Sequence, residues 1–570
     1  MFWIYFFILN LLFFLPRYLM EARSSTFFPY KGLLEGPMKE RVRFLINRYN
    51  YDIFRVSADF FFASILFLLA KSWLPFEVWL GLFFVFLVLI LTYHIYYQVF
   101  ESIYQLEPTF YSNALMLKTG AQIFFRKFGW INFGIVVGAL VLLALIFFLL
   151  KQMLLAGYHF QWQVGDYLIA IPFALLSLYS LFNYEYRSYG KIVFPSQVQS
   201  LIRNIRQSLT TKAYLDNMDF EKLVGNRPYH HLKLQDRPNI YFLVIESYGR
   251  LLYDHPQLFP HYQQYMQQLE QQLTDAQWYS TSHLSQAPIT GGASWISYTS
   301  ALMGFKIKEQ GTYLSLMYQE EMQRYEHLVR WLQHQGYKSF RLVPIPSFKG
   351  MKIPWDQYRS FYAIDEWIRA KEMQFKGKCY GFGPCPPDQY SLHFAHEHIT
   401  NRSTEPFFLF FITQNSHSPF LSPSEVVDDW RTLYDASIPP QMSSSIFVRP
   451  KLADYRSAIQ YQLSFLVDFI LKKGTSQDLF FLIGDHQPPT FPKPGAGLET
   501  PVHVISKNEA LVRSFSNYGF SKGLLVEDKN AYLRHEGTFS LLVRELLQQY
   551  GKKGQSVPPY LPEGIGFDHS

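Results

Sequence analysis

Long apolar stretches separated by short polar segments fill the first third of the chain. Each is about as long as the roughly 20 residues that a helix needs to cross a bilayer. We therefore predict five membrane-spanning helices, at residues 2–19, 56–74, 78–100, 130–154 and 167–182. The first begins at Met1 with no basic segment before it and no small-residue cleavage site after it, which favours a retained helix over a cleaved signal peptide.

Beyond residue 185 the pattern changes twice. A polar segment contains SQVQSLIRNIRQSLTTKAYL, in which apolar residues recur at helical spacing. After residue 238, apolar runs of strand length alternate with helical patterns: NIYFLVIE, KSFRLV, FFLFFIT, DLFFLIG and PVHVIS. Such runs are typical of a parallel sheet covered by helices on both faces. The predicted organisation is a helical transmembrane domain at 1–184, a linker with juxtamembrane helices at 185–237, an α/β domain at 238–553 and a tail at 554–570.

Composition agrees with a membrane segment joined to a folded domain. Only 17% of the 570 residues are charged, against about 25% in ordinary soluble proteins. The hydrophobic content of 49% and aromatic content of 18% exclude intrinsic disorder. The net charge of +7 suits a partner with anionic lipid headgroups but identifies none. No basic motif with interleaved aromatic residues is present, so nucleic acid is not an expected partner.

The charge pattern leaves the membrane orientation open. Basic residues are concentrated around the segment between the first and second apolar runs: Arg17, Arg23, Lys31, Lys39, Arg41, Arg43, Arg48 and Arg55. Positive charge normally favours the cytoplasmic side. Five spans with a cytoplasmic N-terminus would instead place this segment and the C-terminal part outside. With an even number of spans, both ends of the chain could be cytoplasmic.

Three residues that could bind a metal follow predicted strands. Glu246 comes after NIYFLVI, and the pair Asp485 and His486 comes after DLFFLIG. In open α/β sheets, ligands bind outside the carboxyl ends of the strands. Two carboxylates and one imidazole form a suitable ligand set for a divalent metal ion. Taken singly, each has a simpler interpretation, because an Asp after a strand often caps a helix and an acidic–histidine pair often lies at the surface.

Hydroxyl groups precede a predicted helix in APITGGASWISYTSALMG. The helix begins at Ser294 and ends before Gly304, and Thr290 lies just ahead of it. The start of a helix stabilises an anion through its free N–H groups and its dipole, although simple N-capping explains a serine there equally well. A metal near such a hydroxyl would make it a nucleophile for phosphorus or sulfur esters. His417, after FFLFFITQNS, is a candidate general acid, phosphate contact or second metal ligand, or is structural.

The two cysteines lie close together in KCYGFGPCPP, a loop rich in Gly and Pro. We predict a disulfide between Cys379 and Cys385, which indicates an oxidising compartment and an external C-terminal domain. Two unrelated thiols or a metal pair are the alternatives. The spacing C-x5-C without companion ligands makes a metal pair the poorer of them. With only two cysteines the chain is not a disulfide-rich scaffold.

Four short blocks resemble a known family. VIESYG, the hydroxyl loop ending at Gly304, NSHSP and GDHQPP are similar to blocks of the sulfatase-type branch of the alkaline phosphatase superfamily. By architecture the chain resembles lipoteichoic acid synthases and lipid A phosphoethanolamine transferases. That resemblance implies about five membrane helices followed by an external, metal-dependent α/β domain that forms a phosphorylated Thr or Ser. It also implies a bacterial cytoplasmic membrane protein with its catalytic domain on the periplasmic or extracellular side.

The same resemblance implies roles for individual residues. Glu246, Asp485 and His486 would bind one or two divalent metal ions, most plausibly Zn or Mn. Ser294 stands ten residues before Gly304, the spacing that many superfamily members show for the nucleophile, and Thr290 is the alternative.

Further residues have expected roles around the substrate. His417 would face the substrate, His503 would contact a second metal or the phosphate, and His283 and Trp355 would line the donor pocket. The sequence SWISY lacks the Pro and Arg of the formylglycine motif C/S-x-P-S-R, so sulfate-ester hydrolysis by that route is not expected.

The function implied is transfer of phosphoglycerol or phosphoethanolamine from a phospholipid donor to a glycan or glycolipid acceptor. The covalent intermediate would form on Ser294 or Thr290. Two alternatives stay open: a hydrolase that releases phosphate or sulfate to water, and a catalytically inactive lipid-binding regulator of the same fold.

Overall fold

The computed structural model of the chain divides into two compact units. Met1–Tyr214 make up nearly all of the first, and Leu215–Pro492 with Ala496–Ser570 form the second. The residues that the structure describes are 1–20, 55–104, 108–114, 130–182, 194–225, 228–345, 355–381, 385–435, 437, 451–489, 491–492, 497–530 and 532–565.

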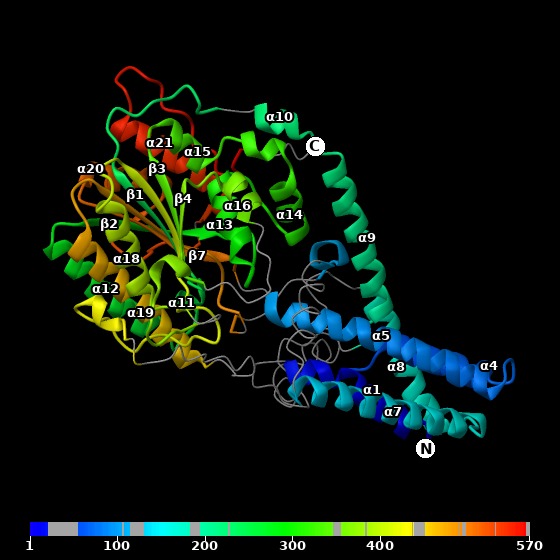
Figure 1. Ribbon diagram of the computed structural model, residues 1–570. Helices are drawn as coiled ribbons and strands as arrows, with labels where there is room; N and C mark the ends of the chain where they lie inside the picture. The colour runs from blue at the N-terminus through cyan, green and yellow to red at the C-terminus, as the bar shows by residue number, and fades with distance from the viewer. Residues whose placement is uncertain are drawn as a thin grey trace. The chain divides into compact units, whose positions relative to one another are not determined.

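The first unit is built from helices (Figure 1). They are α1 (Phe2–Met20), α4 (Ala58–Ala70), α5 (Phe76–Tyr104), α7 (Trp130–Tyr158), α8 (Val164–Phe182) and α9 (Gln197–Asp216). All five predicted apolar runs lie on helices. By length and composition, Phe76–Phe100, Phe133–Tyr158 and Val164–Phe182 suffice to cross a membrane, whereas Phe2–Pro16 and Ala58–Ala70 are shorter apolar helices.

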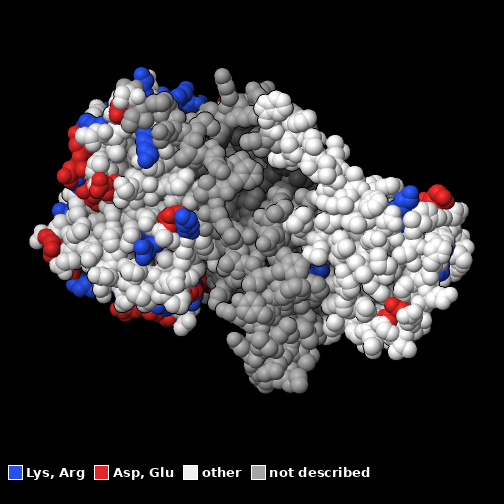
Figure 2. Space-filling view, turned by 90° about the horizontal axis from the view of Figure 1, so that it is seen from below, with Lys and Arg blue, Asp and Glu red and all other residues white. Residues whose placement is uncertain are grey.

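Apolar side chains cover the outside of these helices as well as the inside. An inner cluster includes Phe6, Phe60 and Leu150, all nearly inaccessible to solvent. In contrast, Leu140 on α7 and Leu168 on α8 are 61% and 73% exposed. Figure 2 shows this part, on the right, almost free of Lys, Arg, Asp and Glu. A large exposed apolar surface of this kind marks contact with lipid or with another protein.

The predicted helix at 196–215 is α9, and a carboxylate caps its start. Asp59 on α4 accepts hydrogen bonds from the Ser196 hydroxyl (2.6 Å) and from the backbone N–H groups of Gln197 (2.5 Å) and Val198 (3.1 Å). A negative charge is favourable there because the first N–H groups of a helix have no partner within it.

The second unit contains a mixed sheet in the strand order β4-β3-β5-β1-β6-β7-β2-β8, with β9 beside β2. Its strands are β1 (Asn239–Ile245), β2 (Tyr279–Gln286), β3 (Lys338–Val343), β4 (Glu366–Arg369), β5 (Phe407–Ile412), β6 (Asp478–Gly484), β7 (Glu499–Ser506), β8 (Ser521–Lys522) and β9 (Leu533–Arg534). The first five in spatial order, from β4 to β6, run parallel.

The five predicted strands are all present, but one runs in an unexpected direction. PVHVIS lies within β7, which is antiparallel to β6 rather than parallel. The connection from β6 to β7 holds no helix among its described residues, so the chain simply reverses. Parallel neighbours need a longer crossover, usually a helix.

Helices cover both faces of the sheet (Figure 1). They include α12 (Phe259–Asp275), α13 (Ser294–Met303), α15 (Leu328–His334), α18 (Asp388–Thr400), α19 (Leu452–Lys473) and α21 (Thr538–Tyr550). Tyr241 and Leu243 of β1 join a core cluster with residues of α12, α18 and α19. On the opposite face, Phe410 of β5 packs against Tyr298 of α13, with ring centroids 5.1 Å apart. The apolar residues on both faces of these strands explain why their runs are continuous rather than alternating.

Candidate active site

Strand register brings the predicted carboxylates together. β1 and β6 are parallel neighbours with Ile245 opposite Gly484, so the next residues, Glu246 and Asp485, leave the sheet at the same level. Glu246 is 3% exposed, and Asp485 and His486 are each 1% exposed. The ligand atoms of these three residues all lie within 4.8 Å of one another. Glu246 and the distant pair Asp485 and His486 thus form one buried group at the carboxyl edge of the sheet.

The two carboxylate oxygens of Asp485 have different surroundings. Its Oδ1 accepts hydrogen bonds from the N–H groups of Ser247 (2.8 Å) and His486 (2.7 Å). Its Oδ2 is buried and has no hydrogen-bond partner among the described residues. A buried carboxylate oxygen without a partner is costly, and this one points at the ring of His486, whose Nε2 is 3.2 Å away.

The tautomer of His486 is fixed by its neighbour. Nδ1 lies 2.8 Å from the backbone oxygen of Gln487, which can only accept, so Nδ1 carries the proton. Burial lowers the pKa of His486, which favours the neutral ring. Nε2 therefore presents a lone pair toward Asp485 and Glu246. Histidines that bind metals are commonly oriented by such a bond from the other nitrogen to a carbonyl.

Ser294 completes the group from the start of α13. Its hydroxyl donates to Glu246 Oε2 (2.9 Å), and its Oγ lies 3.1 Å from His486 Nε2. Ala293, just before it, adopts a left-handed conformation (φ 54°), and Gly304 ends the helix at φ 78°. This local geometry sets the Ser294 hydroxyl at the helix N-terminus, where free N–H groups and the dipole favour an anion.

The motif glycines let the two strand-end segments pack backbone to backbone. A Cβ on Gly249 would lie 2.8 Å from the Cα of Gln487, and one on Gly484 would lie 2.0 Å from the backbone oxygen of Tyr248. The Ser297 hydroxyl of α13 donates to the backbone oxygen of Asp485. VIESYG, GDHQPP and α13 therefore form one packed unit.

The loop after β5 wraps around Glu246. Thr413 Oγ1 accepts from the Glu246 N–H (3.0 Å), and the Ser416 hydroxyl donates to the Glu246 backbone oxygen (2.7 Å). His417 is the next residue, half-buried, with Nδ1 2.7 Å from the Ser418 backbone oxygen. Its imidazole is close enough to act on the charge of Glu246.

Asp388, buried at the start of α18, holds the loop after β5 through hydrogen bonds. Its carboxylate accepts from the N–H groups of Gln414 and Asn415 and from the Gln462 side chain, at 2.7 to 3.0 Å. Burial raises the pKa of Asp388 to about 7. Asp388 thereby fixes the backbone that carries His417.

The pKa values of the two carboxylates in the group are shifted in opposite directions. Burial and the charge of Glu246 raise the pKa of Asp485 well above its ordinary value. Burial also acts to raise the pKa of Glu246, but the imidazoles of His417 and His486 and nearby hydrogen bonds outweigh it, so this pKa is lowered. Two carboxylates this close cannot both ionise readily unless a cation neutralises them.

The residues present fit a divalent metal ion. Glu246 and Asp485 supply oxygen ligands, His486 supplies a nitrogen with its lone pair free, and the unpartnered Asp485 oxygen needs a cation. Such oxygen and nitrogen sets suit zinc or manganese. A bound divalent ion would stabilise negative charge on the Ser294 oxygen and on a phosphoryl group.

The described hydrogen bonds of Thr290 and His503 go to other residues than these. The Thr290 backbone oxygen accepts from the Gln487 N–H (3.0 Å), which places the residue in the loop ahead of α13. Both ring nitrogens of buried His503 are engaged, with Nδ1 2.6 Å from the Ser282 hydroxyl and Nε2 3.0 Å from the Tyr248 hydroxyl. His503 thus links β7, β2 and the segment after β1.

His283 and Trp355 also have other neighbours. His283 is buried on β2, where its ring packs against Phe520 at 5.4 Å, and burial lowers its pKa. Trp355 begins α16 (Trp355–Tyr362) and packs against Trp367 of β4, with ring centroids 5.6 Å apart. The described contacts bring neither into the group around Ser294.

The predicted disulfide is not formed. Cys379 and Cys385 are both thiols, and burial raises the pKa of each. Tyr380, not Cys379, faces Cys385 in an antiparallel bridge with two N–H···O bonds of 2.8 and 3.0 Å. The cysteines therefore give no evidence about the compartment.

Sequence reasoning missed the residues that position this group. Thr413 ends the β5 segment and would have been found by inspecting every residue after a strand. Ser247 and Ser416 flank residues already singled out, but a serine beside a motif carries no distinct signal. Asp388 carried no signal in the sequence, because an Asp at the start of a helix is usually a capping residue.

A family model and several solved structures match the chain. The model of the sulfatase family matches residues 238–535. No curated protein matches. The integral membrane lipooligosaccharide phosphoethanolamine transferase A of Neisseria meningitidis is 15% identical, with a TM-score of 0.43 over 86% of this chain and 87% of that one.

Two further structures each match 60% of the chain. The lipoteichoic acid synthase LtaP of Listeria monocytogenes is 13% identical, with a TM-score of 0.36 over 60% of this chain and 80% of that one. The Streptococcus pyogenes phosphoglycerol transferase GacH, in complex with sn-glycerol-1-phosphate, is 13% identical, with a TM-score of 0.35 over 60% and 86%. The family assignment rests on the family model.

Proposed function

Because the chain belongs to the sulfatase family, we propose that it is a membrane-anchored, metal-dependent transferase of phosphoryl headgroups, with Ser294 as the nucleophile. The observation that carries this proposal is the position of the Ser294 hydroxyl. It stands at the start of α13, within hydrogen-bond distance of both Glu246 and His486 and beside the unpartnered Asp485 oxygen.

In the first step, Ser294 Oγ attacks the phosphorus of a phospholipid headgroup phosphodiester. Glu246 Oε2, which already accepts the hydroxyl hydrogen bond, receives the proton. The bond between phosphorus and the diacylglycerol oxygen breaks, and the departing oxygen takes up a proton. The start of α13 holds the phosphoryl oxygens. Diacylglycerol leaves, and the headgroup phosphate stays on Ser294.

In the second step, a hydroxyl of the acceptor attacks the same phosphorus. The acceptor loses its proton to His417, which the loop after β5 places beside Glu246. The bond between phosphorus and Ser294 Oγ breaks, and the serine regains from Glu246 the proton that it gave up in the first step. The headgroup is then joined to the acceptor through a new phosphodiester.

The N-terminal helices explain why donor and acceptor would both be membrane-bound. Among the described residues, three helices are long enough to cross a bilayer, and they share the chain with the second unit, which carries Ser294 and is the catalytic unit of this proposal. We propose phosphoglycerol or phosphoethanolamine as the headgroup and a cell-envelope glycan or glycolipid as the acceptor. The location we propose is the bacterial cytoplasmic membrane, with the catalytic unit on its outer side.

Mass spectrometry of the purified full-length protein tests the proposal. The protein is incubated with a divalent metal and either phosphatidylglycerol or phosphatidylethanolamine, and the peptide spanning residues 288–304 is analysed. We expect a phosphoglycerol or phosphoethanolamine adduct on Ser294, with release of diacylglycerol. The matched variants are Ser294→Ala, which should carry no adduct, and Thr290→Ala, which should carry the same adduct as the wild type.

Each other result has a definite meaning. An adduct on Thr290 would keep the transferase and replace the nucleophile. Free headgroup phosphate released with no acceptor requirement would indicate a hydrolase. Absence of both adduct and diacylglycerol with either lipid would overturn the proposal and favour a lipid-binding protein without this activity.

A further inference from the structure

A second group of metal-type side chains lies in the catalytic unit, away from Ser294. His230 precedes β1, Glu326 precedes α15, and His334 is the last residue of α15, shortly before β3 begins. All three therefore belong to the amino-terminal side of the parallel strands, whereas Glu246 and Asp485 follow their carboxyl ends. The ligand atoms of the three lie within 4.8 Å of one another.

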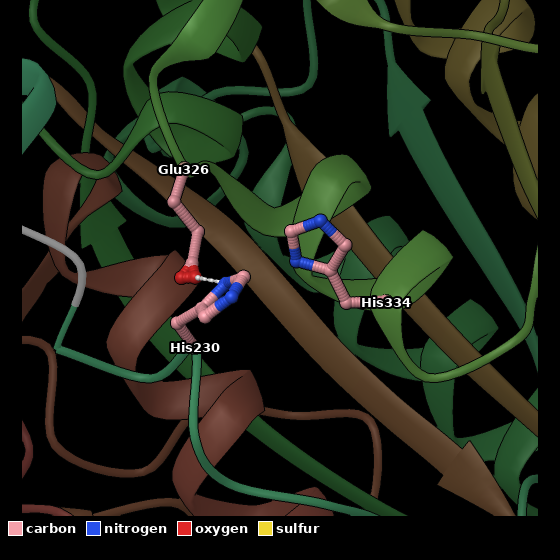
Figure 3. A group of neighbouring side chains, drawn as sticks. All are labelled: His230, Glu326 and His334. Atoms are coloured by element: carbon pink, nitrogen blue, oxygen red, sulfur yellow. Dashed lines mark ion pairs between the residues drawn. The ribbon is translucent and has the colours of Figure 1, made fainter.

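The three side chains converge on one point (Figure 3). His230 Nδ1 is 3.5 Å from Glu326 Oε2, and the ring centroids of His230 and His334 are 4.7 Å apart. The Glu326 side chain is only 2% exposed, whereas that of His230 is 51% exposed. A buried carboxylate is thus covered by two histidines that solvent, and a metal ion, can reach.

The backbone that carries both histidines is fixed by hydrogen bonds between the two segments. The Trp331 indole donates to the backbone oxygen of Tyr229 (3.2 Å), next to His230. The Lys233 ammonium donates to the backbone oxygen of His334 (3.1 Å). The side chain of Gln335 bonds to Leu232 and Leu234, each at 3.0 Å. The positions of the histidines are therefore set before any ion binds.

We propose that His230, Glu326 and His334 form a second divalent metal site, with zinc as its ion and water as the fourth ligand. Two neutral imidazoles and one carboxylate form a common zinc set in tetrahedral geometry. Zinc ligands stand about 2.0 to 2.2 Å from the ion. The three side chains must therefore move closer together, and a small change of rotamer in the exposed histidines allows this. Zinc neutralises the buried Glu326 carboxylate.

The proposed site joins two distant segments of the chain. It ties the segment that leads into β1 to α15, and the two segments are separated by roughly 100 residues of chain. Closing a long loop removes more conformational entropy from the unfolded chain than closing a short one. The site therefore clamps the beginning of the catalytic unit to its sheet, and it takes no part in the chemistry at Ser294.

Cobalt titration of the full-length protein in detergent tests this inference. Cobalt alone is added to metal-stripped protein, because tetrahedral cobalt absorbs strongly in the visible range. Asp485→Asn with His486→Ala first removes ligands of the site around Ser294. In that background we expect about one equivalent of tetrahedral cobalt, and adding His230→Ala with His334→Ala should abolish it. His231→Ala, an exposed histidine beside the first ligand, is the matched control and should keep the signal.

A second readout separates lost binding from lost folding. Zinc should raise the melting temperature of the Asp485→Asn/His486→Ala protein by a few degrees, because an ion that binds only the folded state stabilises it. The metal-free melting temperature should be the same with and without His230 and His334. If no cobalt binds in this background, or if binding persists without these two histidines, the group is an ion pair only and the inference is wrong. Neither readout depends on transferase activity.

Discussion

A single hydroxyl carries the proposed covalent chemistry, and its neighbours make its removal informative. Ser294→Ala deletes the atom that lies 2.9 Å from Glu246 and 3.1 Å from His486 but leaves all three proposed metal ligands in place. We expect headgroup transfer to fall by about 10³-fold or more, as for other lost nucleophiles. Thr290→Ala should stay within about threefold of the wild type, because the described hydrogen bond of Thr290 to the site segments is made by its backbone oxygen.

The measurement is transfer rate together with bound metal. Ser294→Ala should retain the metal content of the wild type, since the serine oxygen is not needed to hold the ion. If the variant loses metal as well as activity, its inactivity would say nothing about a covalent step. If it keeps both, the nucleophile is elsewhere.

Asp388 makes the stability of the catalytic unit depend on pH. Its pKa is about 7 in the folded protein, raised by burial from an ordinary 3.8. Folding therefore gains stability from this group at low pH, where it is protonated, and that gain is lost as the pH rises from about 4 to about 7. The difference between the two pKa values corresponds to at most about 4 kcal/mol.

Asp388→Asn tests this titration. The free energy of unfolding of the wild type, minus that of the variant, should fall between pH 4 and pH 7 and stay level above pH 7. Denaturant unfolding of both proteins at three or four pH values measures the difference, and effects of other groups cancel. A difference that rises with pH over this range would mean that the hydrogen bonds from Gln414, Asn415 and Gln462 outweigh burial.

At the scale of helices and strands, the sequence predicted where each strand lies in the chain better than it predicted how the strand pairs with its neighbours. Continuous apolar runs located the five strands, and the rule that ligands follow strand ends located Glu246 and Asp485. The direction of β7 was not predictable from its own residues, because the reversal lies in the connection before it. Cys379 and Cys385 are close in sequence, yet no disulfide joins them in the structure.

Local hydrogen bonding decides which histidines join the site, and sequence does not record it. His486 follows the end of β6, His503 lies within β7, and each is 1% exposed. In His486 a carbonyl occupies Nδ1 and leaves Nε2 facing the carboxylates. In His503, hydroxyls from β2 and from the segment after β1 engage both nitrogens. Only the tertiary partners distinguish them.

The packing between β3 and α13 contains a buried cation. Arg341 of β3 is 6% exposed, and the rings of Tyr298, Tyr362, Trp367 and Phe410 lie 4.7 to 4.9 Å from its guanidinium carbon. It donates to the Tyr298 hydroxyl (2.7 Å), and its Nε and Nη1 have no hydrogen-bond partner among the described residues. The aromatic rings, rather than a carboxylate, stabilise this charge.

The cage predicts an unusual order of substitutions at this position. Arg341→Lys should destabilise the protein more than Arg341→Met. A lysine ammonium is more strongly hydrated and cannot spread its charge between four rings, whereas methionine fills the space without burying a charge. Melting temperatures of the two variants in detergent provide the comparison. A lysine variant as stable as the wild type would show that charge, and not the planar guanidinium, is what the cage requires.

At the scale of the whole molecule, the side of the membrane that holds the catalytic unit is directly measurable. Both native thiols are buried, with Cys379 7% and Cys385 0% exposed. A cysteine at the exposed position Gln264 on α12 is thus the only readily labelled one in the described C-terminal unit. We expect Gln264→Cys to react with a membrane-impermeant maleimide in intact spheroplasts. Labelling only after lysis would place the catalytic unit in the cytoplasm and remove outer-leaflet donors from the proposed function.

A second cysteine resolves the conflict with the basic residues between the first two apolar runs. Four predicted spans separate that segment from the catalytic unit, and an even number of crossings returns the chain to the same side, whether or not the first run crosses. Ser25→Cys should therefore be labelled from the same side as Gln264→Cys. The segment's positive charges would then face anionic headgroups of the outer leaflet, against their usual preference.

Among the helices of these four predicted spans, α4 is the shortest. Its 13 residues span about 20 Å, less than the roughly 30 Å of a bilayer core. If Ser25→Cys is protected while Gln264→Cys is labelled, one of the four runs does not cross, and α4 is the first candidate. The basic segment would then lie in the cytoplasm, where its charge favours it, and the catalytic unit would remain outside. Both results keep the proposed chemistry and differ only in the path of the chain through the membrane.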